Sequence, residues 1–99
     1  MLTRESAQLQ VAAELDAWNS TLSDLEQFVV LDEHTMERPW GWVFFYTTRG
    51  WQNGDERYLV AGNGPLLVNR NTGEVRHLLT SRSIALQLAE YEIEIEHGI

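Results

Sequence analysis

The chain has 99 residues, a length that fits one domain with a single core. Its hydrophobic share of 43% and its four tryptophans are typical of a globular protein and exclude a mainly disordered chain. Cysteine is absent, which excludes disulfides and thiolate chemistry, and a formal net charge of −8 disfavours binding to nucleic acids or anionic membranes and favours basic partners.

The first predicted element is a helix that begins after Thr3, the expected N-cap. Apolar residues recur there at steps of three or four, as one helical face requires: Ala7, Val11, Leu15, Trp18 and Leu22. We expect the helix to end near residues 19–21, Asn-Ser-Thr, because three poor helix formers adjoin at that point.

Two predicted strands follow. Residues 28–31 are aromatic, β-branched and aliphatic, which favours a strand, and residues 32–39 are predicted to be its end and a loop, in which Pro39 ends the pairing. Residues 41–48 form the clearest predicted strand. Trp42, Phe44 and Tyr46 share one face, and apolar groups also occupy the other, so we expect a central strand covered at least partly on both faces.

The segment after this strand is predicted to be irregular. Residues 49–57 contain two glycines and adjacent polar residues, which indicate a loop, and residues 58–61 are predicted to add a short strand. Residues 62–65, Gly-Asn-Gly-Pro, predict a fixed turn.

A hairpin is the most specific local prediction. Residues 66–68 and 74–78 are its expected strands, and the short polar loop between them ends in Gly73. Such a loop fits a type I turn followed by a bulge, with Gly73 in the left-handed conformation.

The last predicted element is a helix capped by the hydroxyl groups near Ser83. Its apolar residues share one face: Ile84, Leu88, Tyr91 and Ile95. Residues 90–96 also alternate with period two, so helix and strand both remain open for this tail. We expect one domain over residues 1–99, of α+β class, with an antiparallel sheet of about four strands and both terminal helices packed against one face.

No recognisable catalytic constellation is present. The three histidines, His34, His77 and His97, fit no known zinc spacing, and the serines near residue 83 are better explained as caps than as nucleophiles. The turn at 62–65 opens no helix and therefore predicts no phosphate loop. Paired carboxylates are a weak signal in a chain with 15 Asp and Glu residues. We predict no catalytic, cofactor-binding or metal-binding residue.

Surface aromatic residues and carboxylates are the candidate partner contacts. Trp18 and Trp42 are predicted core residues, whereas Trp40 and Trp51 lie at a Pro-Trp-Gly junction and in a polar loop, where a tryptophan is a typical interface anchor. The alternative is that each folds back over the sheet edge. The candidate set is Trp40, Trp51, Asp55, Glu56, Asp32, Glu33 and Glu37.

The segment GNGPLLVNRNTGEV at 62–75 resembles the immunity protein 35 family, also described as YrhB-like domains. The upstream GWVFFY at 41–46 and residues 80–91 fit the same pattern in the same order, so the resemblance covers nearly the whole chain, about residues 5–95. It implies a small bacterial α+β protein that neutralises a cognate toxin domain in the cytoplasm, and it implies no catalytic residue. The loop at 49–58 shows no family pattern, and partner choice is expected there.

The residues and the resemblance together predict an immunity protein that occludes a basic toxin domain. No apolar stretch follows the N-terminus and no run could span a bilayer core of about 30 Å, so we expect a soluble, cytoplasmic protein. The alternative is a chaperone-like protein, alone or as a homodimer, with an exposed apolar patch of several hundred Å² or more. A small enzyme is a third possibility, and it would need a concave pocket with convergent polar groups.

Overall fold

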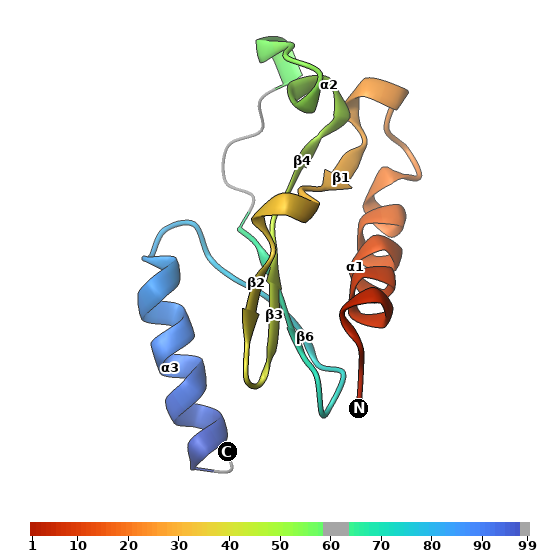
Figure 1. The fold of residues 1–99 in the computed structure, drawn as a ribbon. Coiled ribbons are helices and arrows are strands. Elements are labelled where there is room, and N and C mark those ends of the chain that lie inside the picture. Colours follow the sequence, from red (N-terminus) through yellow and green to blue (C-terminus); the bar gives the residue numbers. More distant parts are fainter. Residues whose placement is uncertain (59–63, 98–99) are drawn as a thin grey trace.

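The computed structural model of the chain describes residues 1–58 and 64–97 and has three layers, with a sheet between two helices (Figure 1). The helices are α1 (Arg4–Asn19) and α3 (Ile84–Glu96). The four-stranded antiparallel sheet has the order β2-β3-β5-β6, formed by Met36–Arg38, Gly41–Phe44, Leu66–Asn69 and Val75–His77. A two-stranded sheet pairs β1 (Phe28–Val30) with β4 (Tyr46–Thr48). These elements confirm the α+β class and the four-stranded sheet.

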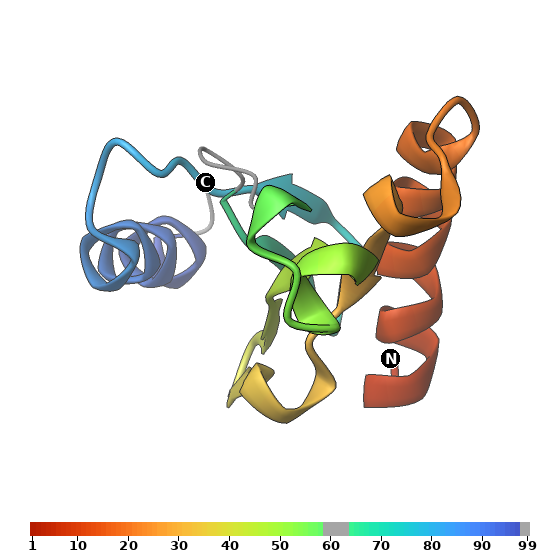
Figure 2. The same cartoon turned by 90° about the horizontal axis from the view of Figure 1, so that it is seen from above.

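The two long helices cover opposite faces of the sheet, as Figure 2 shows from above. The cluster beneath α1 contains Val11 and Leu15 packed against Phe44, whereas the cluster beneath α3 contains Leu88 packed against Val43 and Leu67. The prediction that both helices pack against one face is therefore wrong. The physical reason is that β3 and β5 are buried at every position, and a strand with apolar side chains on both faces needs a cover on each.

The predicted strand at 41–48 is divided at Phe45 into β3 and β4, which join different sheets. Strand β3 pairs with β2 and β5, and β4 pairs with β1, in the register Phe28 opposite Thr48. The carbonyl of Phe45 accepts a hydrogen bond from the Leu31 amide at 2.8 Å, so the backbone remains paired through the break. The side-chain alternation also continues, with Tyr46 in the cluster beneath α1 and Phe45 against the cluster beneath α3.

Helix α1 has the predicted boundaries. The Thr3 hydroxyl accepts a hydrogen bond from the Ser6 amide at 3.1 Å, and the Ser6 hydroxyl accepts one from the Thr3 amide at 2.9 Å. At the other end, the Asn19 side chain accepts from the Phe28 amide at 2.7 Å and donates to the Phe28 carbonyl at 3.1 Å. This amide thus pairs with β1 as a neighbouring strand would and fixes β1 beside the end of α1.

The predicted hairpin is confirmed in β5 and β6. Gly73 has a φ of +76° and donates to the Asn69 carbonyl at 2.9 Å. The side-chain oxygen of Asn69 accepts from the amides of Asn71 and Thr72 at 2.8 and 3.0 Å, which fixes the turn from inside. Much of the predicted strand at 58–61 and half of the turn at 62–65 lie outside the described residues.

The structure also has elements that the sequence did not predict. Residues 36–38 form β2 where a loop was expected, and the 49–57 segment contains the short helix α2 (Arg49–Gln52). Within residues 1–58 and 64–97 there are also three 3₁₀ turns, at Asp24–Glu26, Asp32–His34 and Glu56–Tyr58. Residues 84–96 are helical, with Ser83 as the cap that accepts from the Leu86 amide at 3.3 Å, which decides the question left open for this tail.

Candidate protein-binding surface

The predicted contact residues fall into two groups. Trp51 belongs to α2 and Asp55 and Glu56 lie just after it, at one end of the molecule, whereas Glu37 lies on β2, well away from that end (Figure 1). Asp32 and Glu33 belong to the 3₁₀ turn between β1 and β2. The structure therefore does not bring the predicted set together into one patch.

Thr48 holds the α2 end of the molecule in place. Its hydroxyl oxygen accepts a hydrogen bond from the Trp51 amide at 3.2 Å and donates one to the Tyr58 carbonyl at 2.6 Å. Gly50 packs so closely on Tyr58 that a Cβ at this position would lie 2.4 Å from the ring. Trp51 itself is 38% exposed, so a fixed backbone presents part of an indole ring to solvent.

Asp55 is largely occupied by its neighbour Arg57. The Asp55 carboxylate accepts from the Arg57 amide, Nε and Nη2 at 3.1, 3.0 and 2.7 Å. These hydrogen bonds lower the pKa of Asp55 and pair its carboxylate with Arg57. Glu56 is exposed and has no ion pair within the described residues, so it carries the free charge beside Trp51.

The second group is also partly used by the fold. Asp32 accepts from Arg4 Nη2 at 3.2 Å, which ties the start of α1 to the turn before β2. Glu37 accepts from Arg70 Nη2 at 3.0 Å, and the Arg70 guanidinium lies 4.7 Å from the centroid of the Trp42 ring. Glu33 is exposed and has only a 4.0 Å contact with His34. Among these three acids, Glu33 alone has no arginine partner within the described residues.

Trp40 is not the exposed anchor that the sequence suggested. It is 6% exposed, and its ring meets Tyr91 of α3 edge-on, with centroids 4.9 Å apart. The alternative expectation, that the ring folds back over the sheet, describes it correctly. Trp40 still lines a surface pocket at the last turn of α3.

The pairing of charges shows where the negative excess lies. Six of the seven arginines form ion pairs, and these pairs use seven of the fifteen carboxylates. Eight carboxylates therefore have no arginine partner among the residues that the structure describes: Glu5, Glu14, Asp16, Glu26, Glu33, Glu56, Glu92 and Glu96. They are distributed over α1, the three 3₁₀ turns and α3, so the negative excess is spread over the molecule and attracts basic partners over a long range.

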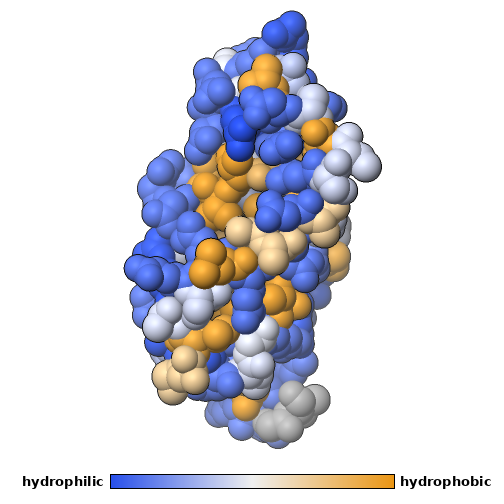
Figure 3. All heavy atoms as spheres, turned by 90° about the vertical axis from the view of Figure 1, so that its right-hand side faces the viewer, coloured by the Kyte–Doolittle hydropathy of each residue, from blue (hydrophilic) through white to orange (hydrophobic). Residues whose placement is uncertain are grey.

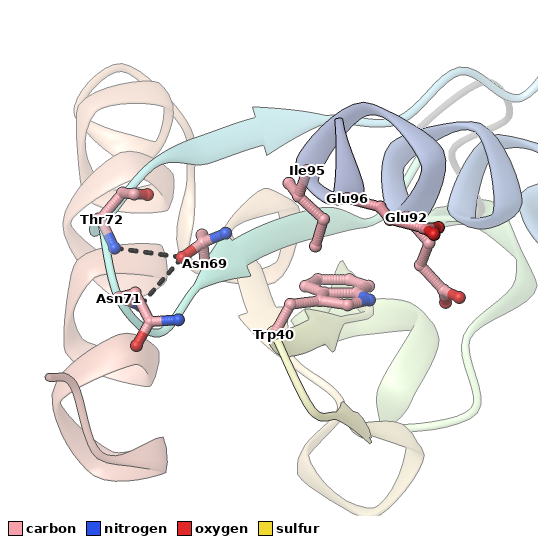
Figure 4. A pocket seen from close by; sticks show the side chains of 7 residues that line it. All are labelled: Trp40, Asn69, Asn71, Thr72, Glu92, Ile95 and Glu96. Carbon is pink, nitrogen blue, oxygen red and sulfur yellow. Dashed lines mark hydrogen bonds between the residues drawn. The ribbon is translucent and has the colours of Figure 1, made fainter. Parts of the chain in front are cut away.

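Sequence reasoning missed a pocket of about 600 Å³ at the last turn of α3 (Figure 4). Its walls come from α3, the β5–β6 turn and the turn before β3: Trp40, Asn69, Asn71, Thr72, Glu92, Ile95 and Glu96. The alternating glutamates at 90–96 are the feature of the sequence from which two of the pocket residues could have been predicted. On a helix, Glu92 and Glu96 share one side, and Glu90 and Glu94 share another.

The paired glutamates of α3 give a pH-dependent contribution to stability. Hydrogen bonds from Arg76 lower the pKa of Glu94, and those from Arg82 lower the pKa of Glu90. A carboxyl group whose pKa is lower in the folded state stabilises the fold at neutral pH, and this stability is lost as the pH falls through the folded pKa.

We therefore expect the melting temperature to fall as the pH is lowered from 6 to 3, with the loss beginning at about pH 5. Glu94→Gln should melt lower than wild type at pH 6 and show a smaller decrease on acidification. Glu92→Gln removes a carboxylate without an arginine partner and serves as the matched control. Thermal scans monitored by circular dichroism test this, and equal pH dependence in wild type and Glu94→Gln would contradict it.

An apolar surface lies on the α1 side of the molecule, where Figure 3 shows hydrophobic atoms running between hydrophilic ones. Two adjoining grooves there, of about 340 and 380 Å³, share Gln8 and Ala12. One is lined by α1 and β1, and the other contains Leu9, which is 71% exposed. The sequence did not indicate where on the molecule such an apolar surface would lie.

Across 1–58 and 64–97, no group of three or more His, Asp or Glu side chains could hold a metal ion. In the same ranges, no helix has the length and apolar character needed to cross a membrane.

The fold and its surface define a small, acidic α+β protein in which eight carboxylates have no arginine partner among the described residues. The chain belongs to the immunity protein 35 family, whose model matches residues 5–94 and so confirms the resemblance seen in the sequence. It is also similar to "Uncharacterized protein YrhB" of Escherichia coli K12, with 32% identity over 77 residues, 77% of this chain and 81% of that protein. No solved structure matches the chain.

Proposed function

We propose that this protein is a cytoplasmic immunity protein that binds a cognate toxin domain and blocks it by covering its surface, without catalysis. The family match over residues 5–94 carries the immunity role. The eight carboxylates without arginine partners support a basic toxin, because an acidic surface raises the rate at which a basic partner docks. An interface of about 800 Å² per partner is within reach of a domain of this size.

The α2 end is the proposed docking surface. Trp51 supplies a partly exposed aromatic ring on a backbone fixed by Thr48, and Glu56 supplies a free charge beside it. Rigid aromatic anchors contribute strongly to binding because little conformational freedom is lost when they are buried. Glu33 lies on a different part of the surface and belongs to the same complex only if the toxin spans both.

Trp51→Ala should weaken toxin binding about tenfold or more, since a central tryptophan is typically worth about 2 kcal/mol in an interface. Glu56→Arg should slow association and flatten its dependence on salt. Surface plasmon resonance against the cognate toxin domain measures both effects. The control is Leu79→Ala, which truncates a 55% exposed residue outside the α2 end. Unchanged affinity for Trp51→Ala would place the docking surface elsewhere.

Co-expression tests the function itself. Cells producing the cognate toxin domain should grow when this chain is also produced, and the two proteins should elute together in size-exclusion chromatography. Absence of both protection and a complex would overturn the immunity proposal.

The apolar grooves on α1 support a second candidate, a chaperone-like protein that shields unfolding clients. Such a protein needs an accessible apolar surface, and Leu9 with the grooves beside it offers one. The two functions differ in how many kinds of protein are bound. Suppressed aggregation of several unrelated heated enzymes, reduced by Leu9→Ser, would favour the chaperone, whereas one tight partner would favour the immunity protein.

A further inference from the structure

The pocket at the last turn of α3 contains two carboxylates that the fold itself does not need. Glu92 and Glu96 lie one helical turn apart, where like charges repel each other. They also lie near the C-terminal end of α3, where the helix dipole disfavours negative charge. No residue of the described chain forms an ion pair with either of them.

Their neighbours on the same helix show the contrast. Glu94 accepts from Arg76 Nη1 at 2.8 Å, and Glu90 accepts from Arg82 Nη2 at 2.7 Å, so these two carboxylates stabilise the packing of α3. Residues that destabilise their own helix and make no compensating contact are expected at functional sites.

A second, independent observation lies in the same pocket. Trp40 is 6% exposed, and its indole N–H is buried without a hydrogen-bond partner among the described residues. Figure 4 shows the nitrogen-bearing edge of the ring turned toward the Glu92 side chain, in the pocket that both residues line. A buried donor without an acceptor is unfavourable, and a ligand that brings an acceptor oxygen would remove that penalty.

The walls of the pocket are held in place before any ligand arrives. The Asn69 amide donates to the Tyr91 hydroxyl at 2.9 Å, and the other end of the Asn69 side chain fixes the β5–β6 turn. Tyr91 in turn supports the Trp40 ring by edge-on contact. A site built in this way loses little freedom on binding.

We propose that this pocket receives a lysine or arginine side chain of the toxin as a second contact, away from the α2 end, and the inference rests on the proposed function. Glu92 and Glu96 pair with the cationic group, and the apolar surfaces of Trp40 and Ile95 cover the methylene stem. The Trp40 indole N–H donates to a backbone carbonyl beside that basic residue. A metal ion is a poorer fit, because the described residues contain no group of ligands able to hold one.

The pocket is tested first without the toxin. The indole N–H signal of Trp40, assigned in ¹⁵N-labelled protein with Trp40→Phe, is titrated with N-acetyl-arginine methylamide and with N-acetyl-alanine methylamide. We expect the arginine probe alone to shift the signal, and the shift to disappear in the Glu92→Gln/Glu96→Gln variant. No shift with the arginine probe, or equal shifts with both probes, would overturn the pocket proposal.

Toxin binding provides the second measurement. Glu92→Gln/Glu96→Gln should bind the toxin at least about tenfold more weakly, mainly through faster dissociation. Glu5→Gln/Asp16→Asn removes two unpaired carboxylates from α1 on the opposite face and should change only the association rate. Equal affinities of the two double variants would overturn the pocket while leaving the immunity role intact. If wild type binds no toxin, the immunity proposal fails, and the titration still decides the pocket.

Discussion

Phe44→Ala should lower the free energy of unfolding by about 3–5 kcal/mol, a large part of the stability of a small domain. The Phe44 side chain is 0% exposed and lies in the cluster between the sheet and α1. Its removal leaves a cavity that the surrounding strands cannot fill, because β3 is paired on both sides. Urea denaturation monitored by tryptophan fluorescence measures the loss.

The neighbouring residue provides the control for this experiment. Phe45 is partly exposed, and it lies at the break between β3 and β4. Phe45→Ala should therefore cost clearly less than Phe44→Ala. If the two variants lost the same free energy of unfolding, burial beneath α1 would not be what makes Phe44 important for stability.

Gly41→Ala should destabilise the protein by more than about 3 kcal/mol. Gly41 has a φ of +156°, and a Cβ at this position would lie 1.9 Å from the Val68 carbonyl oxygen and 3.1 Å from the Arg70 nitrogen. All of these atoms belong to backbone in or next to the β3–β5 pairing, so relieving the overlap requires the two central strands to separate at the Gly41 end of that pairing. The loss of stability should appear as a lower denaturant midpoint and as faster amide hydrogen exchange in β5.

Gly54→Ala separates steric overlap from backbone strain. Gly54 has a φ of +94°, and a Cβ added there would have no described atom within 4 Å, so alanine meets only the conformational cost of about 1–2 kcal/mol. A Gly41→Ala variant no less stable than Gly54→Ala would contradict the steric argument.

Elements with local signals could be predicted from the sequence. The boundaries of α1 follow from Thr3 and Asn19, and the β5–β6 hairpin follows from the turn that ends in Gly73. Strand β2 could not be predicted, because Met-Glu-Arg has neither alternation nor β-branched residues. It is a strand only through its pairing with β3. The alternation at 90–96 fitted helix and strand equally, and packing of Leu88 and Tyr91 on the sheet decided it.

The surface was harder to predict, because its charges are arranged by contacts between distant segments. Arg4 binds Asp32, 28 residues away, and Arg70 binds Glu37, 33 residues away, so the free acids could not be told from the paired ones. The burial of Trp40 likewise depends on Tyr91, from the last helix. Trp51 and Glu56, whose surroundings are local, lie on the surface as the sequence indicated.

The four-stranded sheet ends in two short strands, β2 and β6, which carry Glu37 and Arg38 on one edge and Arg76 and His77 on the other. Because charged and brief edges are poor templates for further strand pairing, neighbouring copies of the chain have little opportunity to extend one another's sheet. Separate copies of the chain should therefore stay apart even at high protein concentration, with little tendency toward fibrous aggregation.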